Sequence, residues 1–206
     1  MNIALLGASG RTGQLILDNA LKDGHYVRAL SRNVSAINDD HPNLSIIEGD
    51  VLNEEDIELC FHNCDAVISA LGTDKNDVLS KSAPLILQTM RKHRIDRIIT
   101  IGTAGILQSR VNPSLYRFQT SESKRKSSTA AEDHLRTYLM LKNSKMNWTI
   151  VCPTYLPEGK RTGVFRTEKE VLPEGGISIS VSDTADFAYS LISDNESYYC
   201  RIGISY

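Results

Sequence analysis

The chain has 206 residues, of which 41% are hydrophobic and 23% are charged, and its formal net charge is -2. This composition is typical of a globular protein and excludes disordered and fibrous classes, while the charge gives no overall attraction to nucleic acid or to an anionic membrane. No apolar run approaches the roughly 18 residues of a membrane span, and no secretory signal pattern precedes the first predicted strand. We therefore expect one cytoplasmic domain, a monomer or a small homo-oligomer, with no nucleic-acid or membrane partner.

The four cysteines are dispersed along the chain, which indicates reduced thiols in a cytoplasmic protein. Cys60, His62 and Cys64 form the local pattern CFHNC, but zinc-like spacing requires a fourth ligand that the pattern lacks. We expect no metal site, with one of these two thiols buried and the other exposed. Met90 and Met146 are expected to pack in the core.

The first thirteen residues contain a strand, a glycine-rich turn and the start of a helix, in the sequence MNIALLGASGRTG. Gly7 would make the tight turn, Gly10 would let a pyrophosphate approach the backbone, and Gly13 would let the helix pack against the strand. The N–H groups at the positive end of the helix dipole would hold the phosphates. An ordinary turn is the alternative, but the flanking strand and helix favour a dinucleotide site. The residues expected to bind there are Gly7, Ser9, Gly10, Arg11, Thr12 and Gly13.

The second strand is predicted over residues 25–31, after a helix that ends at Gly24. NAD-preferring sites usually place an acid at the end of this strand, where it accepts hydrogen bonds from the ribose 2′-hydroxyl. Here Ser31 and Arg32 occupy that place, and together with Arg11 they could bind a 2′-phosphate through charge-assisted hydrogen bonds. The sequence therefore predicts NADP(H) as the cofactor; the alternative is that Arg32 projects into solvent.

Strands and helices continue to alternate along the chain. Strands are predicted over 44–48, 65–71, 96–102 and 147–152, and helices over 14–24, 53–61, 79–93 and 130–143. This alternation predicts an α/β fold with a Rossmann-type doubly wound parallel sheet, helices on both faces, and function along the carboxyl ends of the strands.

Residues at two of these strand ends complete the predicted cofactor site. Asp50, followed by Val51, would hold the adenine side of the cofactor, or Asp50 would cap the helix that follows. Ala70, Leu71 and Gly72, at the end of the fourth strand, would lie beside the central riboses.

Seven segments, spread over nearly the whole chain, resemble atypical short-chain dehydrogenase/reductases of the NAD(P)H-binding, NmrA-like group, above all its flavin reductases. They are GASGRTG at 7–13, LSRN at 30–33, GDV at 49–51, ALGT at 70–73, DRIITIGTAGIL at 96–107, AEDHLR at 131–136 and WTIVCPTYL at 148–156. The resemblance implies a single NAD(P)-binding Rossmann-fold domain over residues 1–206. It also implies hydride transfer from NADPH to a small, planar acceptor such as a flavin.

The resemblance also suggests three residues around the reacting groups. Thr103, at the end of the fifth strand, would hydrogen-bond the nicotinamide carboxamide or the acceptor, or alternatively would form an ST-type turn. Pro153 ends the sixth strand on the cofactor side. Tyr155 follows where flavin reductases of the group have a histidine, and it could stack on the acceptor or hydrogen-bond it. This departure argues against a tetrapyrrole substrate.

Tyr138 and Lys142 have the spacing of the tyrosine–lysine pair that protonates alcohols or ketones in typical short-chain dehydrogenases. They fall near the carboxyl end of their helix, so we interpret them as ordinary helix-face residues. Without such a pair, flavin or quinone reduction remains feasible because these acceptors take up protons from water.

The connection over residues 108–128 is long, so it is proposed as a lid over the acceptor site. Tyr116 and Phe118 could stack on a planar ring or anchor the segment to the core. The basic run over 124–126 is interpreted as a solvated surface. Residues 157–206 are expected to form a small substrate-side extension, with a helix over 184–193 and a final strand over 199–204.

Two functions of different classes follow from these observations. The first is an NADPH-dependent reductase of flavins, quinones or a similar flat acceptor. The second is a non-catalytic regulatory protein of the NmrA-like type that senses NADP(H) through changed partner contacts. A nucleotide-sugar epimerase or dehydratase is a third and weaker candidate, because it would need the tyrosine–lysine pair and usually a larger second domain.

Overall fold

The computed structural model describes residues 1–37, 40–73, 77–123 and 127–206. Within them, eight strands form one sheet in the order β3-β2-β1-β4-β5-β6-β8-β7. The strands are β1 (Asn2–Leu6), β2 (Tyr26–Ser31), β3 (Leu44–Glu48), β4 (Ala66–Ser69), β5 (Arg97–Ile101), β6 (Asn147–Pro153), β7 (Arg166–Lys169) and β8 (Cys200–Ser205). All neighbouring strands pair in parallel except β7, which is antiparallel to β8.

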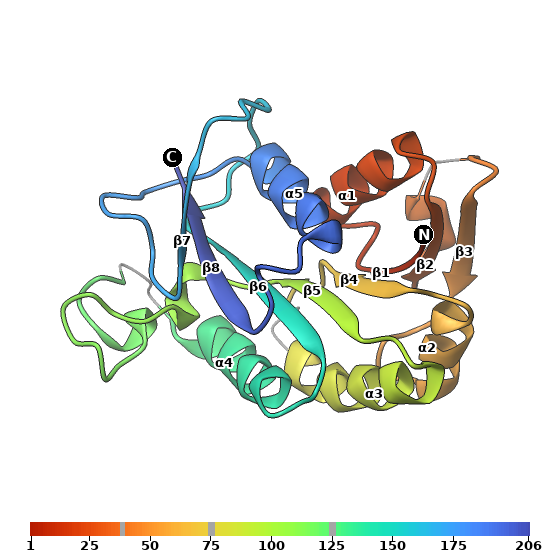
Figure 1. Cartoon of the computed structure of the whole chain (residues 1–206), viewed down its shortest axis with the longest axis horizontal. Coiled ribbons are helices and arrows are strands. Elements are labelled where there is room, and N and C mark those ends of the chain that lie inside the picture. Colours follow the sequence, from red (N-terminus) through yellow and green to blue (C-terminus); the bar gives the residue numbers. More distant parts are fainter. Residues whose placement is uncertain (38–39, 74–76, 124–126) are drawn as a thin grey trace.

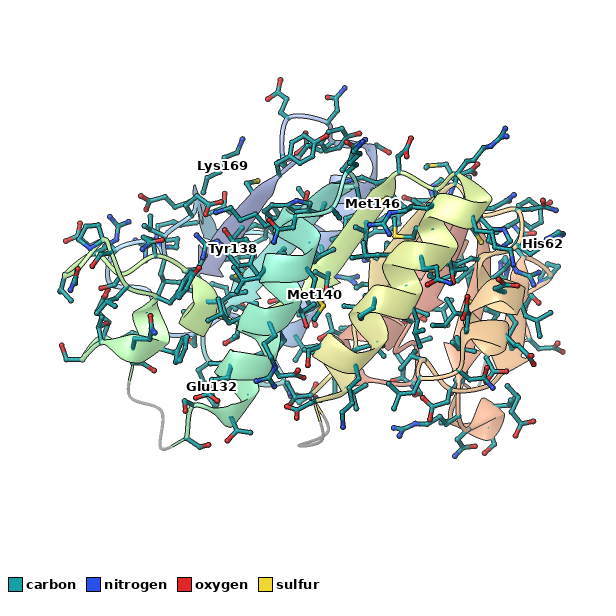
Figure 2. The ribbon with its side chains drawn as sticks, turned by 90° about the horizontal axis from the view of Figure 1, so that it is seen from below. His62, Glu132, Tyr138, Met140, Met146 and Lys169 are labelled. Carbon is teal, nitrogen blue, oxygen red and sulfur yellow. The ribbon has the colours of Figure 1, made fainter. Side chains whose placement is uncertain are left out.

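Five α-helices cover the two faces of this sheet (Figure 1). They are α1 (Arg11–Lys22), α2 (Glu54–Phe61), α3 (Val78–His93), α4 (Thr129–Lys142) and α5 (Val181–Ser190). Helices α1 and α5 pack together on one face, and α2, α3 and α4 lie side by side on the other, which is the face seen in Figure 2. The predicted doubly wound α/β fold is confirmed.

Both faces of the sheet are buried, and β1 shows why the strand sequences are almost continuously apolar. Ile3 and Leu5 belong to the hydrophobic cluster under α1 and α5, whereas Ala4 and Leu6 belong to the cluster under α2, α3 and α4. Successive side chains of a strand point to opposite faces, so each layer of helices receives alternate residues. The order of the strands reverses at β1, with β2 on one side and β4 on the other, and such a reversal places a crevice at the carboxyl ends of these strands.

Several element boundaries differ from those predicted. Helix α1 begins at Arg11, three positions before the expected Gln14, so that Gly13 lies in the first turn of the helix. Helix α2 begins after Asn53, whose side chain accepts a hydrogen bond from the Glu55 N–H. Strand β6 includes Pro153, which pairs with Ile204 at the end of the strand, where a missing N–H is tolerated.

The carboxyl-terminal part of the chain is more closely integrated than predicted. Strand β8 joins the sheet beside β6, and α5 packs against α1, so residues 157–206 extend the sheet and one of its helical layers. Strand β7 was not predicted, because the segment RTEK is wholly exposed and lacks the apolar residues that mark a strand. Charged residues are common on edge strands, which they protect from pairing with other chains.

The four cysteines are free and buried. The expectation that one thiol of the CFHNC pattern would be exposed was wrong, since both Cys60 and Cys64 lie in the core. Burial raises the pKa of Cys64 to about 11, so this thiol stays protonated at neutral pH. Met90 and Met146 pack in the core, as predicted.

The described residues match neither the pattern of a metal site nor that of a membrane-spanning helix. Across the described ranges, no three histidine, cysteine, aspartate or glutamate side chains are grouped as metal ligands would be. No helix in this part of the chain has the length and apolarity needed to cross a bilayer.

Candidate functional site

A cleft of about 250 Å³ opens at the carboxyl ends of β1, β2, β3 and β4, where the strand order reverses. Its wall includes many of the residues that the sequence predicted, namely Gly7, Ser9, Gly10, Ser31, Arg32, Asp50, Val51, Ala70, Leu71 and Gly72. It also includes residues that the sequence analysis did not assign, namely Leu30, Asn33, Gly49, Leu52 and Val78. Four of these flank the predicted binding residues at 31–32 and 50–51, so extending each of these two runs by one residue in both directions would have found them. Val78 begins α3, and only the fold brings it to the cleft.

The glycine turn between β1 and α1 is closely packed and has no room for side chains at two of its glycines. Gly7 adopts a φ of +79°, and a Cβ there would lie 2.7 Å from the Ala70 carbonyl oxygen. A Cβ on Gly13 would lie 2.0 Å from the Gly7 carbonyl oxygen, so this position also excludes a side chain. The Gly10 N–H donates to the Gly7 carbonyl at 3.0 Å, which closes the turn.

Helix α1 starts at this turn with its first N–H groups available. Its N-cap is Gly10, and no side chain caps the helix there. The N–H groups of the first turn have no partner within a helix, and the helix dipole makes this end positive. Arg11, Thr12 and Gly13 supply three of these N–H groups, so the turn can hold an anion such as a phosphate.

The end of β2 gives the cleft a basic wall. Arg32 is exposed on the wall, while Ser31 is buried and its hydroxyl donates to the Asn33 carbonyl at 2.9 Å. The Asn33 side chain accepts from the Ser35 N–H at 3.1 Å and so caps the short 3-10 helix at Val34–Ala36. This tight local structure fixes the backbone on both sides of Arg32.

Asp50 borders the cleft beyond the end of β3. Its carboxylate accepts from the Leu52 N–H at 3.0 Å, and Asn53 caps α2. The alternative expectation that Asp50 caps this helix was therefore wrong, because the turn from Asp50 to Asn53 places a better-positioned cap three residues later. The Asp50 N–H in turn donates to the Asp56 carboxylate at 2.8 Å, which holds the strand end against α2.

The remaining predicted residues lie outside the wall of this cleft. Thr103 follows β5 and is buried. Its hydroxyl accepts from the Gly105 N–H at 3.3 Å, and this contact is the ST-type turn that was the alternative expectation. Pro153 is buried at the end of β6. Tyr155 follows it and is 72% exposed. Arg11 lies at the start of α1, where its guanidinium donates to the Leu156 carbonyl at 3.3 Å and pairs with the Glu158 carboxylate at 3.4 Å.

Tyr138 and Lys142 do not form a catalytic pair. Tyr138 lies on α4 (Figure 2), is 5% exposed and belongs to the hydrophobic core. Its ring meets the Trp148 ring edge-on at 5.7 Å. The Lys142 ammonium lies over the face of the Tyr138 ring, 5.9 Å from its centroid. Burial raises the pKa of Tyr138, whereas a catalytic pair requires a lowered one. These contacts are consistent with the interpretation of both residues as ordinary helix-face residues, and the face that carries Tyr138 is buried.

Within the segment 108–128, Tyr116 packs against core residues. The Tyr116 ring lies edge-on to Tyr138 at 6.3 Å and beneath the Arg201 guanidinium at 5.5 Å, so anchoring describes its contacts. Arg201 is itself 3% exposed, donates to the Ile106 carbonyl and pairs with Glu170. The basic run at 124–126 lies outside the described residues.

The chain matches a known protein family and resembles a bacterial relative over almost its whole length. A family model described as NAD(P)H-binding matches residues 7–195. YwnB of Bacillus subtilis (strain 168), an uncharacterized protein, is 28% identical over 203 residues, which cover 95% of this chain and 92% of YwnB.

Two solved structures resemble the whole chain. A candidate epimerase of Bacteroides thetaiotaomicron has a TM-score of 0.87 at 27% identity, covering 100% of this chain and 96% of that protein. A candidate NADH-flavin reductase of Streptococcus pneumoniae TIGR4 has a TM-score of 0.83 at 26% identity, covering 100% and 99%. Because the family model spans most of the sequence, the chain belongs to the NAD(P)H-binding family.

Proposed function

We propose that this protein is an NADPH-dependent reductase that transfers a hydride to a flat acceptor such as a flavin or a quinone. The observation that carries the proposal is the basic wall of the cleft at the end of β2. Ser31, Arg32 and Asn33 stand where an acid would select NADH by binding the ribose 2′-hydroxyl. An arginine at this point can form charge-assisted hydrogen bonds with the 2′-phosphate that only NADPH carries.

The other parts of the cleft fit the rest of the adenosine half. The phosphates would lie on the N–H groups at the start of α1, the adenine beside Asp50 and Val51, and the central riboses along Ala70–Gly72. At about 250 Å³ the cleft is smaller than the roughly 300–1,000 Å³ of common ligand sites. The nicotinamide half would therefore extend from the cleft toward Thr103 and Pro153.

The acceptor would meet the nicotinamide near Tyr155, whose exposed ring could stack on a planar molecule. Bound NADPH supplies the hydride, and a flavin or quinone that accepts it takes the accompanying proton from water, leaving NADP⁺. Thr103, whose side chain is held by the hydrogen bond from the Gly105 N–H, would orient the reacting groups. The streptococcal relative is a candidate NADH-flavin reductase, which supports a flavin as the class of acceptor. Epimerase chemistry is less well supported, because Tyr138 is buried away from the cleft.

The cofactor preference is tested by Arg32→Ala. We expect NADPH to bind about tenfold or more weakly, with NADH binding little changed, because only NADPH loses a charge-assisted contact worth about 1.5–3 kcal/mol. Titration calorimetry with both cofactors measures this change. The matched control is Arg91→Ala, which replaces an exposed arginine in the last turn of α3, just before the amino-terminal end of β5. An Arg32→Ala protein that kept its preference for NADPH would contradict the assignment.

Turnover separates the reductase from the alternative NADP(H) sensor. NADPH oxidation is measured against a panel of flavins and quinones in the same preparation that is used for binding. Oxidation that depends on the acceptor supports the reductase. Tight NADPH binding without oxidation by any acceptor in the panel would contradict it and favour the sensor.

A further inference from the structure

The loop over residues 155–163, here called the acceptor-side loop, is held in one position by the start of α5. The Asp183 carboxylate accepts from the N–H groups of Thr162 and Gly163 at 2.8 and 2.9 Å. Earlier in the loop, the Pro157 carbonyl accepts from the Val181 N–H at 3.0 Å. The loop is therefore a fixed surface against which a side chain from another element can be placed.

Two arginines connect this loop with the layer formed by α1 and α5, and their contacts differ in strength. Arg161 of the loop pairs with Asp186 of α5 at 2.6 Å, and the Asp186 side chain is 30% exposed. Arg11 of α1 pairs with Glu158 of the loop at 3.4 Å, and these side chains are 57% and 75% exposed. A long ion pair between exposed groups contributes little to stability, so the Arg11–Glu158 pair is the one that another anion can replace.

Arg11 also has the right location to meet an acceptor. It begins the helix that follows the glycine turn, and its guanidinium reaches the Leu156 carbonyl at 3.3 Å, next in the chain to the exposed Tyr155. A planar molecule stacked on Tyr155 would thus lie on the same loop as a cation with an exchangeable partner. Guanidinium groups bind phosphate and carboxylate in bidentate geometry, which an exposed glutamate at 3.4 Å does not satisfy.

We propose that Arg11 determines specificity for acceptors that carry an anionic group, a phosphate or a carboxylate, which displaces Glu158 from its guanidinium. This inference rests on the proposed reductase function, because it concerns the acceptor side of the same site. It assigns the Arg11 side chain to the acceptor, while the Arg11 N–H stays at the phosphate turn. The Glu158 carboxylate then competes with the acceptor's anionic group for the Arg11 guanidinium, and it holds the guanidinium in place when no acceptor is bound.

The test compares flavin mononucleotide with riboflavin, which share one ring system and differ by a phosphate. Binding is measured by quenching of flavin fluorescence with NADP⁺ present, so that no turnover is needed. We expect the wild-type protein to bind flavin mononucleotide about tenfold more tightly than riboflavin, and Arg11→Gln to abolish this difference. Glu158→Gln should have the opposite effect and strengthen flavin mononucleotide binding, because it removes the competitor.

The opposite signs distinguish this role from a structural contact. If the pair only held the loop, both substitutions would weaken both flavins alike, as we expect for the matched variant Arg161→Gln. That outcome for Arg11→Gln and Glu158→Gln would overturn the inference, as would equal wild-type affinity for the two flavins. Weakened NADP⁺ binding by Arg11→Gln with unchanged flavin binding would overturn it too, and would return the side chain to the cofactor. Absence of NADPH oxidation despite the expected flavin binding would refute the reductase, and with it the role of Arg11 in selecting an acceptor, whereas equal affinity for the two flavins would overturn the role of Arg11 alone.

Discussion

Gly13 is the residue at which the turn and the helix come closest. A Cβ there would lie 2.0 Å from the Gly7 carbonyl oxygen, whereas a Cβ on Gly10 would lie 3.3 Å from the same atom. We expect Gly13→Ala to lower the free energy of unfolding by about 2–3 kcal/mol, because the turn must open to admit the methyl group. Gly10→Ala should stay within about 1 kcal/mol of the wild type. Urea unfolding of the two variants measures this difference, and equal stabilities would contradict it.

Tyr138 offers a second test at the scale of single residues. The Tyr138→Phe substitution keeps the ring that faces Trp148 and Arg201, the latter guanidinium lying 4.3 Å from the ring centroid, and removes only the hydroxyl. Since Tyr138 is a buried residue and burial raises its pKa, we expect the kcat for flavin reduction to change less than about twofold. A loss of kcat by about two orders of magnitude would show that Tyr138 acts as an acid, and would revive the alcohol and epimerase chemistries.

At the scale of elements, α3 is capped by a residue of another helix. Its own N-cap, Asp77, has a left-handed backbone and makes no side-chain cap. Instead the buried carboxylate of Asp133, from α4, accepts from the N–H groups of Leu79 and Ser80 at 3.2 and 3.1 Å. Arg136 of α4 pairs with both Asp77 and Asp133. This network fixes the start of α3, and therefore Val78, at the wall of the cleft.

Because Asp133 caps α3, we expect Asp133→Ala to lower the stability of the fold strongly. Two N–H groups and the Ser80 hydroxyl would lose their acceptor in the interior, so we expect the free energy of unfolding to fall by about 2–4 kcal/mol. Glu132→Ala is the matched control, because Glu132 is exposed on the same turn of α4 and accepts only from the Ser128 hydroxyl among the described contacts (Figure 2). It should cost less than about 1 kcal/mol in the same chemical unfolding experiment. Similar losses in the two variants would refute the cap.

For the molecule as a whole, Asp183 links the acceptor-side loop, α5 and the end of the chain. Burial by itself would raise its pKa, but hydrogen bonds from the Gly163 N–H, the Thr162 hydroxyl and the Tyr206 hydroxyl lower it from 3.8 to about 2. A lowered pKa means that the folded state favours the carboxylate. This contribution is fully present at neutral pH and is lost as the pH falls from about 5 toward 2.

The size of this effect follows from the shift. The difference between the folded and unfolded pKa corresponds to about 2–3 kcal/mol of unfolding free energy, since one pKa unit equals about 1.4 kcal/mol. We expect Asp183→Asn to lose about this amount at pH 7 and to have a correspondingly shallower decline in stability below about pH 5. Urea unfolding across this pH range measures both. A variant whose stability fell with acid as steeply as that of the wild type would contradict the assignment.

Much of the architecture could be predicted because it depends on neighbouring residues. The apolar runs of β1, β4 and β5 and the amphipathic segments between them indicated the doubly wound sheet. The glycine turn and the basic end of β2 indicated a dinucleotide site, and the cleft gathers most of the predicted residues on one wall. The edge strand β7 could not be found in this way, because an exposed strand of four charged and polar residues carries no apolar alternation.

By itself, the sequence determined the order of the elements, the turn built on Gly7, and the place of Arg32 at a strand end, because periodicity and glycine conformation are local properties. Only the tertiary structure decided that Arg11 contacts Glu158, that Asp133 caps α3, and that Tyr138 faces the core. Each of these contacts joins side chains that are distant in the chain or depends on which face of a helix is buried. Such contacts depend on how whole elements pack together. Packing between elements produces no periodic pattern in the sequence from which a single contact could be predicted.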